Sequence, residues 1–131
     1  MNTSVRTKIA KDKKPVFVDK NGVGSPIGIS YNPGLNRYIL TTGHSKSEAD
    51  MLGNFEAHVP WGPWATVSYA TDETWFGHDN PLTVPANCFF WCFPTKWISG
   101  DGMSATMVFT GAGRGQNNDS FNTVRVKFIK H

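Results

Sequence analysis

The chain has 131 residues, of which 39% are hydrophobic and 18% charged, proportions typical of one folded domain with its own core. It contains neither an apolar stretch of about 20 residues that could span a membrane nor the apolar segment of a secretory signal. On that absence we expect a cytoplasmic protein without a membrane partner. The net charge is +3, but five of the 13 basic residues lie within residues 1–14. This distribution predicts a basic tail at residues 1–14 and argues against nucleic-acid binding.

Turn sequences rich in Gly, Asn and Pro divide the rest of the chain into short segments. Between these turns β-branched and aromatic residues dominate, and TVRVKFI (123–129) alternates apolar and charged residues like a half-buried strand. Residues 45–52 have the capping pattern of a short helical turn. We predict one all-β, antiparallel domain over residues 15–131, with at most that one helical turn. In chain order, the predicted strands are residues 26–32, 37–43, 54–59, 64–70, 94–99, 105–111 and 122–129.

The two cysteines, Cys88 and Cys92, lie four residues apart in CFFWC. In a strand their Cα atoms would be about 13 Å apart, which is too far for a disulfide. No further Cys or His completes a metal-binding spacing. We therefore predict two free thiols in a reducing compartment, and neither a metal nor a cofactor.

The sequence contains an internal repeat. Residues 25–43 align without a gap with residues 93–111, which lie 68 positions later. Each copy reads as a strand, a Gly-containing hairpin turn and a second strand that ends in Thr-Gly. The alignment predicts two repeated supersecondary units, which we interpret as blades at about residues 25–70 and 88–129. The matching residues include Pro26 with Pro94, Gly34 with Gly102 and Gly43 with Gly111.

The second unit has one predicted strand fewer than the first. Its fourth strand could come from VFVD (16–19) or from SVRTKIA (4–10), in which case the basic tail would be a closing strand. Either segment would complete the sheet in the way that β-propellers often close.

These segments, with PWGPW (60–64) and PTKW (94–97), resemble the C-terminal two blades of bacterial glycoside-hydrolase-like β-propellers related to arabinanases and levansucrases. The resemblance covers about residues 25 to 129 and implies two propeller-like, four-stranded blades. It also implies structural roles for Glu56, Trp64, Pro94 and Trp97. Full-length relatives carry several further blades, which this sequence lacks, so their activity is not carried over.

The two tryptophans of VPWGPW (59–64) could fill a core or form a platform on which a ligand stacks. The resemblance favours packing for Trp64, whereas Trp61 stays open between the two roles. In both roles a buried indole N–H needs a neighbouring acceptor.

Glycosidases of the resembled type use two carboxylates. The strand openings at Ser25-Pro26 and Phe93-Pro94 lack the acid that relatives commonly place there, so we do not expect catalysis by one chain. We expect instead a self-assembling binding module, a dimer or a trimer, with a glycan or another small polar ligand at the subunit junctions. The alternatives are an enzyme remnant, a hydrolase completed by another chain, and a structural protein without a ligand. The candidate ligand contacts are His44, Trp61, Lys96, Arg114 and Asp119.

Overall fold

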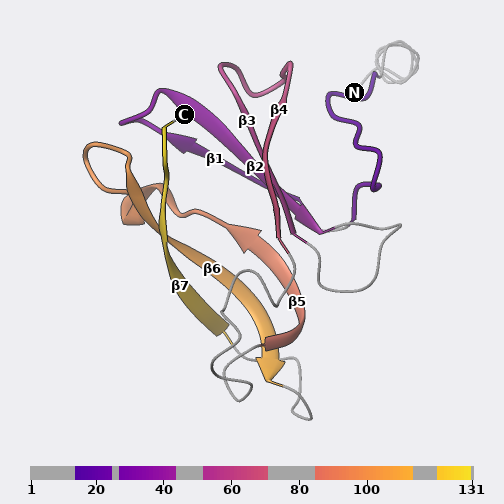
Figure 1. The fold of residues 1–131 in the computed structure, drawn as a ribbon, viewed down its shortest axis with the longest axis vertical. Coiled ribbons are helices and arrows are strands. Elements are labelled where there is room, and N and C mark those ends of the chain that lie inside the picture. The colour runs from indigo at the N-terminus through magenta and orange to yellow at the C-terminus, as the bar shows by residue number, and fades with distance from the viewer. Residues whose placement is uncertain (1–13, 25–26, 44–51, 71–84, 114–120, 131) are drawn as a thin grey trace, which may run out of the picture.

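The computed structural model describes residues 14–24, 27–43, 52–70, 85–113 and 121–130. They form two antiparallel β-sheets, of four and three strands, and one 3₁₀ turn (Figure 1). The predicted all-β, antiparallel fold is therefore confirmed. The predicted helical turn at residues 45–52 lies outside the described residues, except for Leu52, which begins a strand.

The first sheet is a meander of four strands in chain order. It consists of β1 (Ile27–Asn32), β2 (Arg37–Gly43), β3 (Leu52–Ala57) and β4 (Ala65–Ala70). All four were predicted to within about two residues, because each is a short β-prone run bounded by a turn.

The second sheet has the order β5-β6-β7, with β5 (Pro85–Cys92), β6 (Ser104–Gly113) and β7 (Phe121–Lys127). The predicted strand at residues 94–99 is wrong. Thr95–Trp97 form the 3₁₀ helix η1, and only Ile98 forms a bridge, to Ala105. The ring of Pro94 fixes φ at −56°, and the Pro94 carbonyl then accepts a bond from the Trp97 N–H at 2.8 Å, which closes the turn. The CFFWC segment supplies the strand beside β6 instead.

The turns of the two repeats pack against each other. A Cβ on Gly34 would overlap the backbone of Asp101 and Gly102, so the equivalent glycines of the repeat are in close contact. Between them, the buried Asn32 donates from Nδ2 to the Gly102 carbonyl at 2.9 Å and accepts from the Leu35 N–H at 3.1 Å. The repeat thus joins the two sheets at their turns.

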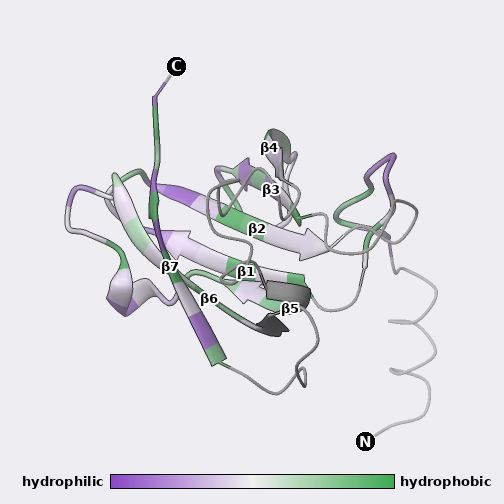
Figure 2. Cartoon of the chain, turned by 60° about the horizontal axis from the view of Figure 1, so that its bottom comes forward, coloured by the Kyte–Doolittle hydropathy of each residue, from purple (hydrophilic) through white to green (hydrophobic). Residues whose placement is uncertain are grey.

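The core lies between the two sheets. Ile39 and Leu52 of the first sheet pack with inward-facing residues of β5 and β6, and Val124 and Val126 of β7 pack against this cluster. The rings of Trp91 and Phe109 stack with centroids 4.5 Å apart. Strand alternation makes this possible, because every second residue of β7 is half-buried. Figure 2 shows both hydrophobic and hydrophilic residues along β7.

Residues 14–24 cover part of the other face of the first sheet, and the prediction that residues 16–19 add a strand is wrong. Phe17 packs on Phe55 with ring centroids 4.5 Å apart, and the Gly24 N–H donates to the Gly43 carbonyl at 2.8 Å. The half-buried Phe17 thus holds the segment against β3 of the first sheet, where it forms no strand. The other candidate, residues 4–10, lies outside the described residues.

Candidate functional site

The two sheets touch along one side and leave a cleft on the other. On the closed side β1 and β2 contact β5: Thr41 Oγ1 donates to the Trp91 carbonyl, and the Phe93 N–H donates to Ser30 Oγ at 3.2 Å. On the open side, β2, β3 and β4 face the C-terminal end of β7 across a cleft of about 720 Å³. Figure 1 shows the two sheets as separate layers, with β1–β4 above and β5–β7 below.

The cleft has an apolar floor and one polar wall. The floor comes from both sheets, because the inward positions of each sheet continue from the core into the cleft. Inward side chains of β3 and β4 form the polar wall, with Asn54, Glu56 and Ser68. The apolar lining residues are Leu35, Ile39, Val67, Phe93, Val126, Phe128 and Ile129.

Asn54 is the most deeply buried polar residue of the wall, with only 5% of its surface exposed. Its Nδ2 donates to Ser68 Oγ at 3.2 Å, whereas its Oδ1 is buried and has no hydrogen-bond partner. An unpartnered buried acceptor costs about 1–3 kcal/mol. The register of β3 with β4 also shifts between Asn54 and Phe55, and bulges of this kind often redirect a side chain beside a functional site.

Glu56 follows Asn54 by two residues and lies on the same face of β3. Its Oε2 lies 3.8 Å from Arg37 Nε, and both side chains are partly exposed. Arg37 also donates from Nη1 to the Asn36 carbonyl at 3.0 Å and lies 3.2 Å from His58 Nδ1. Because a guanidinium can only donate, Nδ1 of His58 is the acceptor in this contact. Arg37 is thus shared among several acceptors, and the Glu56 carboxylate keeps capacity for a ligand.

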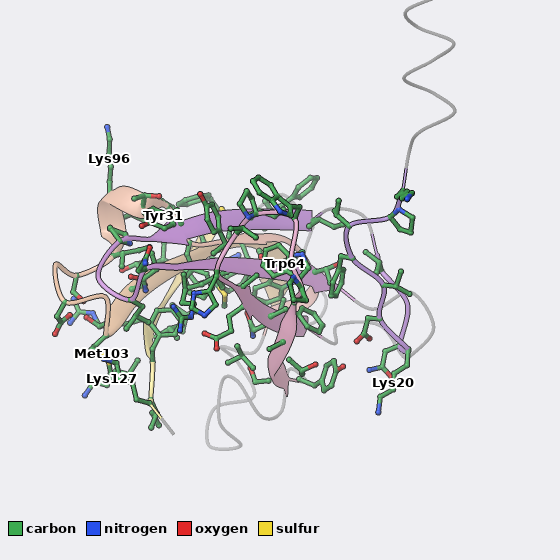
Figure 3. All side chains as sticks on the ribbon, turned by 90° about the horizontal axis from the view of Figure 1, so that it is seen from above. Lys20, Tyr31, Trp64, Lys96, Met103 and Lys127 are labelled. Carbon is green, nitrogen blue, oxygen red and sulfur yellow. The ribbon has the colours of Figure 1, made fainter. Side chains whose placement is uncertain are left out.

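Lysines lie at the opposite lip, where Lys127 and Lys130 contribute to the lining. In Figure 3 the side chain of Lys127 extends outward at the edge of the molecule. The two lysines thus add positive charge at the lip, opposite the polar wall of β3 and β4.

The predicted ligand contacts are not gathered at this cleft. His44, Arg114 and Asp119 lie outside the described residues. Trp61 is 66% exposed in the connection between β3 and β4, and Lys96 is exposed in η1; neither lines the cleft. Figure 3 shows Lys96 extending from the molecule into solvent.

Of the residues predicted to be structural, Trp64 packs edge-on against Phe17 with centroids 6.4 Å apart. This contact fits the predicted packing role, but its partner is the N-terminal segment and not the second sheet. The acceptor predicted for its N–H is not found, because the buried Nε1 has no hydrogen-bond partner. Pro94 is the N-cap residue of η1, Trp97 is 46% exposed, and Glu56 lines the cleft.

Sequence reasoning missed Asn54 and Ser68 as site residues. The available signal was the position of Asn54 in LGNFEA, where alternation places a polar amide on the same face as the buried Leu52. Ser68 could be found only through the register, which places it opposite Asn54.

The groups with shifted pKa values lie outside the cleft lining. Hydrogen bonding to Asp19, at 2.7 Å, raises the pKa of Tyr69. Burial raises the pKa of the Cys92 thiol, which is free, as predicted. The hydrogen bond from Ser99 Oγ holds the pKa of Asp101 below its usual range.

Within the described ranges, no group of three or more His, Cys, Asp or Glu side chains is arranged to hold a metal ion. In the same part of the chain, no helix is long and apolar enough to cross a membrane. The fold and the cleft together define a two-sheet, antiparallel β protein with a mixed polar and apolar cleft between its sheets. The chain matches no protein-family model, no curated protein and no solved structure. The resemblance to propeller blades therefore stays a prediction.

Proposed function

We propose that the protein is a non-catalytic binding module that takes a small polar ligand, with carbohydrate as the best-fitting class, in the cleft between its sheets. The observation that carries this proposal is the cleft itself. Its volume of about 720 Å³ falls within the range of small-molecule sites. It also combines an apolar floor with a few polar groups, which is the usual composition of such sites.

Carbohydrate fits this lining because a sugar presents C–H faces on one side and hydroxyl groups at its edges. Phe128 and Val126 offer apolar surface to the C–H face. Asn54, Glu56 and Ser68 on the facing wall offer hydrogen-bonding groups to the hydroxyls. Both halves of the ligand would thus find a matching surface.

Binding is favoured over hydrolysis by the carboxylates of the cleft. A glycosidase of the two-carboxylate type needs an acid and a base or nucleophile on either side of the bond. Among the described residues that line the cleft, Glu56 is the one carboxylate. The lining therefore supports recognition more than turnover.

We propose further that copies of the chain associate. β1 is an outer strand of its sheet, and Gly28 and Ser30 face the second sheet. The alternate residues Ile27, Ile29 and Tyr31 face away from it and are 47%, 48% and 38% exposed. An apolar row on an outer strand is a surface that proteins usually cover. A second copy would cover it in the proposed dimer or trimer.

The binding proposal is tested by two-dimensional NMR titration of labelled protein with neutral monosaccharides: glucose, galactose, mannose, arabinose and xylose. We expect shifts for residues of β3, β4 and β7. Glu56→Gln should weaken binding about tenfold, because it removes a charged acceptor. The control variant Trp61→Ala changes an exposed aromatic outside the cleft and should leave the affinity unchanged. Shifts confined to Trp61 and its neighbours, or none with any sugar, would refute the proposal.

Association is tested by light scattering across a dilution series. A dimer or trimer that Ile29→Lys converts to a monomer would support the β1 row as the contact. The control is Phe121→Lys, since Phe121 is an exposed residue of β7, the outer strand of the second sheet, and does not line the cleft. A monomer at every concentration would rule out association, while leaving the binding proposal intact.

A further inference from the structure

We infer that Asn54 is the specificity-determining residue of the cleft and that it binds a hydroxyl group of a neutral, polyhydroxylated ligand. This inference rests on the proposed function and names the residue that gives the cleft its selectivity among ligands.

The first step is that one polar atom of the Asn54 amide has no hydrogen-bond partner in the folded protein. The residue is 5% exposed and lines the cleft, but its Oδ1 has no partner. Asn32, the other buried asparagine among the described residues, has both amide atoms hydrogen-bonded: Nδ2 donates to the Gly102 carbonyl and Oδ1 accepts from the Leu35 N–H. The fold thus satisfies one buried Asn and leaves the other with bonding capacity at the cleft.

The second step is that packing alone does not require an amide at this position. The position shares its face of β3 with the buried Leu52, an apolar member of the core. A leucine side chain has the same number of heavy atoms as asparagine, branches at the same Cγ and would need no hydrogen-bond partner. The amide is therefore a cost to the free protein that a ligand could offset.

The third step identifies the ligand group as a hydroxyl. With Nδ2 on Ser68 Oγ, the free atom is an acceptor; with the amide turned over, the free atom is a donor. A hydroxyl both donates and accepts, so it completes Asn54 in either orientation.

The fourth step concerns the charge of the ligand, which we infer to be neutral. Glu56 lies two residues along the same face of β3, so its Cα is about 7 Å from that of Asn54. Arg37 also lines the cleft, with its Nε 3.8 Å from Glu56 Oε2, so the pair presents no net charge to a ligand beside Asn54. A charged ligand group would lose its hydration there without meeting an uncompensated opposite charge, whereas a second hydroxyl would donate to the Glu56 carboxylate. We therefore expect neutral sugars to bind and the corresponding uronic acids to bind more weakly.

The test compares Asn54→Leu with Asn32→Leu, the same substitution at a buried asparagine whose amide is satisfied. Urea unfolding should show a midpoint raised by about 0.5 M for Asn54→Leu and lowered by at least that amount for Asn32→Leu. Asn54→Leu should also weaken binding of the best neutral sugar of the panel at least about tenfold. Glucuronate, galacturonate and mannuronate should bind less tightly than glucose, galactose and mannose.

The outcomes separate the two proposals. If Asn54→Leu lowers stability as Asn32→Leu does, Asn54 is structural and the inference fails, whatever binds in the cleft. If Asn54→Leu is more stable than the parent and binds the neutral sugar with unchanged affinity, other residues recognise the ligand and the inference also fails. Tighter binding of the uronic acids would overturn the neutral ligand class. If no sugar binds, the proposed function fails and this inference with it.

Discussion

Gly102→Ala should destabilise the protein by roughly 3 kcal/mol, because Gly102 lies where the turns of the two repeats meet. Its φ is +73°, a conformation that costs a residue with a side chain about 1–2 kcal/mol. An added Cβ would overlap Asn32 Oδ1 and lie 2.7 Å from the Leu35 nitrogen. The two hydrogen bonds of Asn32 would then be distorted, at about 0.5–1.5 kcal/mol each.

The matched control for this prediction is Gly100→Ala in the same hairpin. A Cβ on Gly100 would meet nothing within 4 Å, so this substitution should change stability by less than about 0.5 kcal/mol. Urea unfolding followed by tryptophan fluorescence measures the stability of both variants. A domain with a free energy of unfolding of about 5–15 kcal/mol stays folded after either change. Equal midpoints for the two variants would refute the close packing of the two turns.

Three further predictions concern stability and titration. Asp101 has a lowered pKa, so its contribution is present above the ordinary carboxyl pKa and is lost as pH falls through the lowered value. Unfolding midpoints between about pH 6 and pH 2.5 should fall less for Asp101→Asn than for the parent, and parallel curves would contradict this. The raised pKa of Cys92 means that, in a Cys88→Ser background, Ellman's reagent should label the native thiol more slowly than the unfolded one; equal rates would exclude a shielded thiol. Met107→Ala, at a residue with no exposed surface, should cost about 2–5 kcal/mol in urea unfolding, and a loss below 1 kcal/mol would place Met107 outside the core.

The sequence predicted the first sheet well because its information is local. RYILTT is a β-prone run between two turn signals, and the structure has β2 there. The repeat was also informative, since the equivalent Gly34 and Gly102 meet in space. Alignment with the first copy was misleading at residues 94–99, where Pro94 and η1 interrupt the strand that the copy implied.

The site was harder to predict because it depends on how two sheets diverge. Trp61 and Lys96 are conspicuous in the sequence, but they lie at exposed turns away from the cleft. The cleft joins β3 and β4 to the end of β7, more than 50 residues later in the chain. Local alternation gives the face on which Asn54 lies, but not the position of β7, which sets the opposite wall.

The arrangement separates the residues that hold the sheets together from those offered to a ligand. The polar contacts of Thr41, Ser30 and Asn32 join the sheets on the closed side and at the turns, where each bond has its partner within the chain. On the open side, the buried Asn54 has an amide oxygen without a hydrogen-bond partner. Substitutions on the closed side should therefore lower stability, and lower binding only through unfolding. Substitutions of Asn54 and Glu56 should change binding in a protein that stays folded. That division follows from which side of the two-sheet structure is closed, and the paired Asn32→Leu and Asn54→Leu variants measure it directly.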